Sequence, residues 1–335
     1  MTRQDVARPS EDDLIARYFR PLATDPGAFR LGDDCATLSP PPGHDLVLKT
    51  DAVAEGIHFF PADPWDVVAK KALRVNLSDL AAKGARPLGY LLSLALPPDW
   101  TEPRLADFAR GLAEDQSEFG ITLMGGDTIR SPDGLIVSIT VLGAVPAGRM
   151  ARRGGARPGD RIYVSGTIGD AALGLRLRLD PDLAQRLGLS DQQRDHLLQR
   201  YLLPQPRQAL APAALTYAHG AMDVSDGLVL DLTRMTSVSS VQARLDIERV
   251  PLSEAARAAI GSDPSLLEAA LTGGDDYELL LTVAEADSAA FEQAAARAGV
   301  AITRIGLIEA GSAGVIPVSR PGVEFHFSTK GFSHF

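Results

Sequence analysis

The chain has 335 residues, of which 45% are apolar and 23% are charged, a composition typical of a folded globular protein with more than one hydrophobic core. Its 43 acidic residues outnumber the 33 basic ones, and no block of Lys and Arg is present, which excludes nucleic acid and an anionic membrane as expected partners. The start has no apolar targeting core, and no stretch is long enough to span a bilayer, so we expect a cytoplasmic protein. The single cysteine, Cys35, excludes an intrachain disulfide, and we expect it to be a small buried residue.

In the N-terminal half, the first expected element is a helix after Ser10, where a hydroxyl and three acids form a capping signal. The next elements, in chain order, are a buried strand over 44–51 that ends in an acid, a helix over 65–83 opened by Pro64, a strand over 88–96, a helix over 102–119 and a strand over 134–144. A Gly-, Pro- and Arg-rich joint over 146–160 then marks a boundary. We therefore predict two domains, 1–147 and 148–335.

In the C-terminal half, strands and helices mix without strict alternation. The expected elements, in chain order, are a strand over 161–165, a helix from Thr167, a surface helical insertion over 180–199, a helix over 207–217, a strand over 220–224, a helix over 228–236, a strand over 278–283, a helix over 287–298 and a closing strand over 302–308. This order predicts an α+β, or mixed α/β, fold class.

Aspartates stand beside glycines or hydroxyl residues at six places, several of them where a strand ends. These places are 32–34, 49–51, 76–79, 125–128, 223–227 and 273–276. Each alone is a common turn, but six in one chain indicate a ligand site. Two carboxylates about 4 Å apart repel by roughly 4 kcal/mol at an effective dielectric constant of 20, so a cluster of them needs cations. Carboxylates without Cys or His ligands favour Mg²⁺ or Ca²⁺, and several Mg²⁺ ions suggest phosphate chemistry.

Other signatures of phosphate handling and metal binding are missing from the sequence. The chain has no G-x-x-x-x-G-K-[ST] loop, no protein-kinase motif set, no calcium-loop pattern and no Cys/His zinc set. The stretch 273–277 superficially resembles the GGDEF signature of diguanylate cyclases, but that interpretation leaves the remaining aspartate loops without a role. We therefore expect a phosphate-handling enzyme of another kind.

The ordered motifs resemble the thiamine-monophosphate kinases, in the superfamily of aminoimidazole-ribonucleotide synthetase-like ATP-binding enzymes. The resemblance runs nearly end to end, and its sharpest stretches are GDDCATL, TDAVAEGIHF, KALRVNLSDLAAKGARP, MGGDTIR, ARPGDRIYVSGTIGD, DVSDGL, GGDDYELL and KGF. It implies a homodimer that pairs through the N-terminal sheet, with ATP bound near the dimer interface. It also implies direct in-line phosphorylation of thiamine monophosphate to thiamine diphosphate, the last step of thiamine diphosphate biosynthesis.

Carried over by position, the resemblance implies a set of residues that bind Mg²⁺, namely Asp34, Lys49, Thr50, Asp51, Asp79, Asp127, Asp223 and Asp226. It implies nucleotide contacts at Gly126, Asp127, Arg152 and Ser225. It implies contacts to the acceptor thiamine monophosphate at His58, Asp275 and Phe332. It implies catalytic roles for Asp51, Asp79 and Asp127.

Three of these positions depart from the family pattern. Lys49 stands where a serine or threonine is usual, Asp275 replaces a glutamate, and Phe332 replaces a tyrosine or tryptophan in many relatives. A protonated lysine cannot ligate Mg²⁺, so only the backbone carbonyl of Lys49 is left for that contact.

Simpler interpretations stay open for several residues. The alternatives are a solvent-facing helix residue for Asp79, surface charge for Arg152, a core histidine for His58 and a terminal packing anchor for Phe332. The rival functions are another enzyme of the same superfamily, such as selenophosphate synthetase or aminoimidazole-ribonucleotide synthetase, and a catalytically silent nucleotide-binding or dimerisation module. Selenophosphate synthetase would need a reactive Cys nearer the N-terminus than Cys35. The sequence also leaves open the number of Mg²⁺ ions and any dependence on K⁺.

Overall fold

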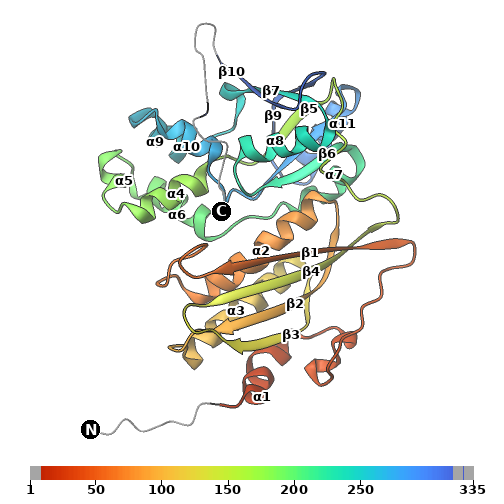
Figure 1. Ribbon diagram of the computed structural model, residues 1–335, viewed down its shortest axis with the longest axis vertical. Coiled ribbons are helices and arrows are strands. Elements are labelled where there is room, and N and C mark those ends of the chain that lie inside the picture. Colours follow the sequence, from red (N-terminus) through yellow and green to blue (C-terminus); the bar gives the residue numbers. More distant parts are fainter. Residues whose placement is uncertain (1–8, 320–326, 328–335) are drawn as a thin grey trace. The chain divides into compact units, whose positions relative to one another are not determined.

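The computed structural model describes residues 9–319 and residue 327, and the chain divides into two compact units. Unit 1 comprises Met1–Pro42, Leu48–Asn76 and Pro87–Ala144, whereas unit 2 comprises Gly43–Val47, Leu77–Arg86 and Val145–Phe335. Each unit contains one β-sheet and its own helices (Figure 1). The predicted mixed α/β class is therefore confirmed.

Unit 1 is built on a four-stranded sheet with the strand order β1-β4-β2-β3. Its strands are β1 (His44–Ala54), β2 (Arg86–Leu96), β3 (Thr122–Arg130) and β4 (Ile136–Pro146). β2 and β3 run parallel. The sequence predicts three of these strands and misses β3, because the Gly-Gly-Asp centre of β3 lacks the β-branched and aromatic residues that favour strands.

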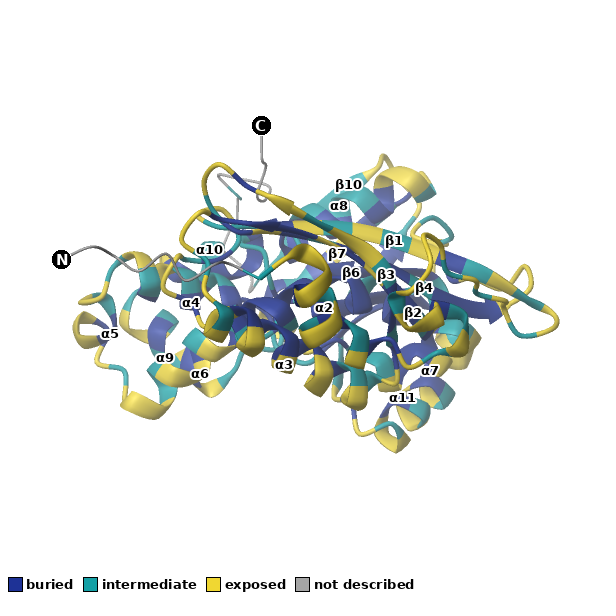
Figure 2. Ribbon diagram, turned by 90° about the horizontal axis from the view of Figure 1, so that it is seen from below, coloured by how far each residue is buried: buried dark blue, intermediate teal, exposed yellow. Residues whose placement is uncertain are grey.

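Two long helices, α2 (Trp65–Ala82) and α3 (Glu102–Phe119), cover one face of this sheet (Figures 1 and 2). Both helices are predicted by the sequence. Thr101 caps the start of α3, and Gly120 ends it with a φ of 63°. Arg74 of α2 donates to both carboxylate oxygens of Asp115 on α3 at 2.8 and 2.7 Å, and both side chains are almost fully buried. This ion pair joins the two helices.

The other face of the sheet is exposed and partly apolar. Leu48, Leu91, Ile129 and Ile136, one from each strand, are 65%, 42%, 54% and 43% exposed. The prediction that the strand over 44–51 is buried is therefore wrong: β1 is an edge strand, and its alternate residues face outward. Exposed large apolar residues on every strand of one sheet face are typical of an interaction surface.

The chain enters unit 1 through short helical turns. They are α1 (Glu11–Leu14), the π-turn η1 (Ile15–Phe19) and the 3₁₀ turns η2 (Arg20–Leu22) and η3 (Pro26–Leu31). The hydroxyl of Ser10 accepts the Asp13 N–H, and the Asp13 carboxylate accepts the Ser10 N–H, which is a complete capping box. The predicted helix start at Ser10 is confirmed.

Unit 2 is built on a six-stranded sheet with the strand order β10-β7-β9-β5-β8-β6. Its strands are β5 (Arg161–Ser165), β6 (Ala218–Val224), β7 (Gln242–Asp246), β8 (Glu278–Val283), β9 (Ile302–Glu309) and β10 (Gly314–Val318). Neighbours are antiparallel except β7 and β10, which run parallel. The expectation that the strand over 302–308 closes the fold is wrong, because β10 follows it and pairs at the sheet edge.

Helices cover both faces of the second sheet. The helices of unit 2 are α4 (Asp170–Leu179), α5 (Leu183–Arg186), α6 (Asp191–Leu202), α7 (Ala211–Tyr217), α8 (Leu228–Ser239), α9 (Glu254–Ser262), α10 (Leu266–Thr272) and α11 (Ser288–Arg297), with 3₁₀ turns η4 (Gln208–Leu210), η5 (Ile247–Arg249) and η6 (Glu285–Asp287). Ile162 of β5 packs in a core with Leu232 of α8, whereas the next residue, Tyr163, packs its ring on Phe291 of α11 with the centroids 5.2 Å apart. Successive strand residues point to opposite faces, so this sheet is buried on both sides.

The predicted helical insertion over 180–199 corresponds to α5 and α6. It is more than a surface addition, because Leu197 of α6 is fully buried in a small core with Leu173 of α4 and Ala256 of α9. None of the helices in the described part of the chain has the length and apolar character that a bilayer span requires.

Candidate active site

The residues expected to form the site are divided between the two units, and each group is considered within its own unit. Unit 1 holds Asp34, Lys49, Thr50, Asp51, His58, Gly126 and Asp127. Unit 2 holds Asp79, Arg152, Asp223, Ser225, Asp226 and Asp275. Phe332 lies outside the described residues.

In unit 2, the turn from β6 to α8 carries the DVSDG motif. Asp223 is the last residue but one of β6 and is only 5% exposed, and Gly227 is the N-cap of α8 with a φ of 111°, a conformation that favours glycine. The backbone N–H groups of Ser225 and Asp226 both donate to one carboxylate oxygen of Asp231, at 3.0 and 2.9 Å. Asp231 therefore holds the backbone of this turn in place.

An arginine completes the arrangement behind this turn. Arg234 donates to the other carboxylate oxygen of Asp231 at 2.8 Å and also forms an ion pair with Asp226. Asp231 is fully buried, and this loss of hydration raises its pKa above the usual value for an aspartate.

The second acidic loop of unit 2, GGDDY, lies directly against the first. The Asp275 N–H donates to the Ser225 carbonyl at 2.9 Å, and the Tyr277 N–H donates to the Val224 carbonyl at 2.8 Å. A Cβ atom on Gly274 would lie 2.4 Å from the Ser225 carbonyl oxygen, so this close approach requires glycine. The two motifs, about 50 residues apart in sequence, thus form one paired structure.

The C-terminal end of α2 reaches the same region of unit 2. The Ser78 hydroxyl donates to the Tyr277 carbonyl at 3.4 Å, and Lys83 donates to the Ala221 carbonyl at 2.8 Å. Asp79, between them on the helix, is half-buried rather than solvent-facing.

Arg152 also lies at this end of unit 2. Its carbonyl accepts the Ala221 N–H at 2.7 Å, two residues before Asp223 on β6, while its side chain is exposed. The structure thus brings Arg152 to the strand that carries the first acidic loop.

In unit 1, neighbouring residues of β1 face opposite sides of the sheet. The ammonium group of Lys49 lies 3.1 Å from an Asp51 carboxylate oxygen. The hydroxyl of Thr50, one residue away on the other face, bonds the Ile139 carbonyl at 3.2 Å and the Thr140 hydroxyl at 3.0 Å. The side chains of Thr50 and Asp51 therefore do not converge within this strand.

Asp127 lies on β3, at the opposite edge of the sheet from β1. It pairs in register with Ser93 of β2, and Ser93 is exposed while its neighbours Leu92 and Leu94 are buried. Asp127 is therefore on the exposed face. Gly126 lies beside it, and a Cβ atom there would come within 1.8 Å of the Leu92 carbonyl oxygen, so the position requires glycine.

His58 and Asp34 are placed by turns rather than by the sheet. The Nδ1 atom of His58 lies 3.1 Å from the Ala54 backbone nitrogen and accepts its N–H, which anchors the ring in the turn after β1. Asp34 and Cys35 lie in an exposed loop. The expectation of a buried Cys35 is wrong, because no apolar element covers this loop in the described structure.

Metal binding can be tested against the donor groups. In the described residues, no three acidic, histidine or cysteine side chains lie together as a ready metal site. Mg²⁺ does not require such a cage, because it is usually held by one or two carboxylates together with substrate phosphates and water. The available donors are carboxylate oxygens, which fit Mg²⁺ in chemical type.

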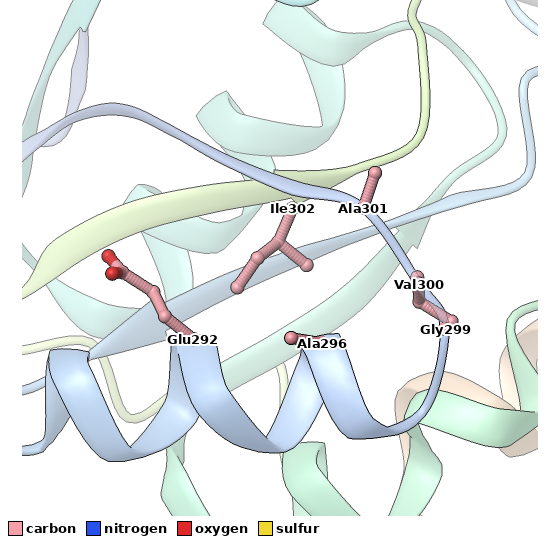
Figure 3. A pocket seen from close by; sticks show the side chains of 6 residues that line it. All are labelled: Glu292, Ala296, Gly299, Val300, Ala301 and Ile302. Carbon is pink, nitrogen blue, oxygen red and sulfur yellow. The ribbon is translucent and has the colours of Figure 1, made fainter.

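A separate hollow lies on unit 2 between α11 and the start of β9. Its volume is about 370 Å³, and it is lined by Glu292, Ala296, Gly299, Val300, Ala301 and Ile302 (Figure 3). The Glu292 carboxylate accepts the Tyr163 hydroxyl at 2.7 Å. The hollow contains none of the expected site residues, so it is not part of the candidate active site.

Comparison with known proteins first shows the class of protein to which the chain belongs. Residues 32–145 match the family described as AIR synthase related protein, N-terminal domain, and residues 157–319 match AIR synthase related protein, C-terminal domain. The two units, with their paired acidic loops, are therefore those of a two-domain AIR synthase related protein.

More similar relatives define the particular family. The thiamine-monophosphate kinase of Caulobacter vibrioides is 46% identical over 305 residues, covering 90% of this chain and 84% of the relative. The Salmonella typhimurium enzyme of the same name is 42% identical over 97% of this chain and 98% of its own. The chain belongs to the thiamine-monophosphate kinase family, and the expectation of a phosphotransferase is confirmed.

Solved structures agree with this family. The crystal structure of thiamine-monophosphate kinase from Stenotrophomonas maltophilia has a TM-score of 0.81 and 39% identity, covering 91% of this chain and 94% of that chain. A structure described as AaThiL complexed with AMPPCP and TMP has a TM-score of 0.76 and 31% identity, covering 91% of each chain.

Proposed function

We propose that this protein transfers the γ-phosphoryl group of ATP to thiamine monophosphate and so makes thiamine diphosphate. The observation that carries the proposal is family membership at 42% identity over 97% of the chain, together with the paired acidic loops of unit 2. The 31% identical structure described with AMPPCP and TMP supports ATP and thiamine monophosphate as the two substrates.

The reaction would proceed in one displacement. A terminal phosphate oxygen of thiamine monophosphate attacks the γ-phosphorus, the bond from that phosphorus to the β–γ bridging oxygen breaks, and ADP leaves. Because a phosphate monoester has a second pKa near 6, the acceptor oxygen is already largely ionised at neutral pH and needs no strong general base. Positioning and charge neutralisation then supply the catalysis.

In unit 2, one loop would bind Mg²⁺ and the nucleotide, and the other would bind the acceptor. Asp223 and Asp226 would hold Mg²⁺, and Ser225 would contact the nucleotide. Asp275, on the paired loop, would contact the acceptor. Asp79 would act as a further Mg²⁺ ligand with a catalytic role, because it lies beside Ser78, which bonds the GGDDY loop.

In unit 1, Asp51 and Asp127 would contribute to Mg²⁺ binding and catalysis, with Asp34 and Thr50 as further ligands, Gly126 at the nucleotide and His58 at the acceptor. In unit 2, Arg152 would contact the nucleotide. Phe332 would complete the acceptor site. Bound Mg²⁺ would neutralise charge on the phosphates.

We include a homodimer in the proposal, formed through the exposed face of the unit 1 sheet. The exposed Leu48, Leu91, Ile129 and Ile136 support it.

The direct test measures ADP release and thiamine diphosphate formation with ATP and thiamine monophosphate, with thiamine and other phosphate monoesters as alternative acceptors. We expect turnover with thiamine monophosphate and complete loss of turnover in excess EDTA. ADP release without thiamine diphosphate, or equal turnover with every acceptor, would refute the proposed substrate. Full activity in excess EDTA would refute the role of Mg²⁺.

A further inference from the structure

Two buried acids lie behind the paired loops of unit 2 and are not among the residues expected to touch a ligand. Asp231 is 0% exposed and Asp276 is 1% exposed. Aspartates are almost never fully buried without a specific partner, because leaving water is costly for a carboxylate. The partners of these two acids therefore show what their burial achieves.

Asp231 binds the DVSDG loop, which carries the residues expected to contact the nucleotide. One carboxylate oxygen accepts the N–H groups of Ser225 and Asp226, and the other accepts Arg234. These bonds fix the backbone at the two residues expected to contact nucleotide and metal. They do not involve the GGDDY loop.

Asp276 joins the GGDDY loop, which carries the expected acceptor contact Asp275, to the start of α4. Both of its carboxylate oxygens accept the Gly169 N–H, at 3.0 and 2.8 Å, and its backbone carbonyl accepts Arg200 at 3.2 Å. The residues on either side, Asp275 and Tyr277, have φ values of 73° and 51°. Such left-handed backbone is rare outside glycine and persists only where the surroundings enforce it.

The Asp276 anchor has a direct effect on the acceptor side chain. Because Asp276 is held inward, the strained residues on either side are fixed with it, and the Tyr277 hydroxyl lies 3.3 Å from an Asp275 carboxylate oxygen. The conformation of Asp275 thus depends on the bond between Asp276 and Gly169.

Each loop therefore has its own buried anchor. The loops touch through backbone bonds such as the one from the Asp275 N–H to the Ser225 carbonyl. The Asp231 carboxylate, however, bonds the DVSDG loop, whereas the Asp276 carboxylate, itself part of the GGDDY loop, bonds Gly169 outside both loops. Loss of one anchor should consequently loosen mainly its own loop.

We propose that Asp231 and Asp276 are positioning residues, Asp231 for nucleotide binding and Asp276 for acceptor binding. This inference rests on the function proposed above. Burial raises the pKa of both carboxyl groups, that of Asp276 strongly.

The test compares the binding of both ligands in two variants, Asp231→Asn and Asp276→Asn. The dissociation constants of AMPPCP with Mg²⁺ and of thiamine monophosphate are measured separately by calorimetry. We expect Asp276→Asn to weaken thiamine monophosphate about tenfold and AMPPCP less than twofold, and Asp231→Asn to do the reverse. The melting temperature of each variant is measured as well, so that a loss of folding can be told from a selective loss of one ligand.

Asp170→Asn is the matched control. Asp170 is fully buried next to Gly169, but its carboxylate bonds Thr167, His196 and Ser253 instead of either loop. We expect both dissociation constants to stay within twofold in this variant. A loss of both ligands to the same extent in either anchor variant, or no change in either, would overturn the proposal.

The outcomes also separate this proposal from the proposed function. If wild-type protein binds AMPPCP but not thiamine monophosphate, the proposed acceptor is wrong, and the Asp231 arm still tests its anchor. If wild-type protein binds both ligands and the crossed pattern is missing, the function stands and the anchors are refuted. Asp231→Ala and Asp276→Ala remove the carboxylate oxygens that accept these hydrogen bonds, so they should enlarge each selective effect.

Discussion

Lys49 should weaken Mg²⁺ binding, and removing its charge should strengthen it. Its ammonium group lies 3.1 Å from an Asp51 oxygen, and the two side chains are 32% and 42% exposed. A Mg²⁺ ion on that oxygen, with a metal–oxygen distance of about 2.1 Å, would lie no more than about 5 Å from the ammonium group. At a dielectric constant near 80 the repulsion is roughly 1.7 kcal/mol, and screening of these half-exposed groups reduces it to about 1 kcal/mol.

A difference of about 1 kcal/mol corresponds to roughly a fivefold change in affinity. We therefore expect Lys49→Met to lower the Mg²⁺ concentration for half-maximal activity about fivefold. Lys49→Thr, which restores a usual family residue, should lower it at least as far, because it also supplies a hydroxyl oxygen. The assay is a Mg²⁺ titration of thiamine diphosphate formation at saturating substrates and constant ionic strength.

The matched control is a second lysine that pairs with an acid away from the expected Mg²⁺ ligands. Lys70 forms an ion pair with Glu114, between α2 and α3, and Lys70→Met removes the same charge as Lys49→Met. It should leave the titration unchanged. An unchanged or higher Mg²⁺ requirement in Lys49→Met would refute the electrostatic reasoning.

The site and the fold lead to four further predictions. Asp79→Asn should lower kcat at least a hundredfold without lowering the melting temperature measured in EDTA, and a near-normal kcat at saturating Mg²⁺ would contradict its role. Asp275→Ala should raise KM for thiamine monophosphate while leaving KM for ATP within twofold, and Asp275→Glu should retain activity; a rise in KM for ATP alone would contradict the assignment. Light scattering at micromolar concentration should give a dimer mass, and Leu91→Glu should shift it toward the monomer, whereas a monomeric wild-type protein would exclude the proposed interface. Asp115→Ala should lower the free energy of unfolding by roughly 2 kcal/mol in denaturant titrations, because it removes the bidentate partner of Arg74 and leaves only Glu118 to pair with that guanidinium, and a change below about 0.5 kcal/mol would contradict this.

The sequence predicts the long elements of the fold well and the short ones poorly. The helices α2 and α3 have clear start and stop signals, so their expected bounds agree with the structure within a residue. β3, β7 and β10 are missed because they are stabilised mainly by pairing with neighbouring strands. β7, for example, has the sequence QARLD, which alternates polar and apolar residues but is short and has no β-branched or aromatic residue.

The candidate site shows a similar division. The DVSDG and GGDDY motifs are recognisable in the sequence, but their mutual contact depends on the pairing of β6 with β8, which brings together residues far apart in the chain. Asp231 and Asp276 lie within or next to these motifs, and the sequence analysis assigns them no role. Their spacing gives one signal, because Asp231 stands five residues after Asp226, close enough to accept N–H groups at the start of its own helix.

If Asp275 contacts the acceptor as proposed, its left-handed backbone restricts how the acceptor preference of this enzyme can be altered. With a φ of 73°, the position tolerates asparagine and aspartate better than other residues with a side chain, and β-branched residues least. Libraries that randomise this position should therefore recover glycine, asparagine and aspartate among folded variants far more often than valine, isoleucine or threonine. Engineering of a new acceptor would then have to proceed through the residues around Asp275 rather than through a bulky replacement of Asp275 itself.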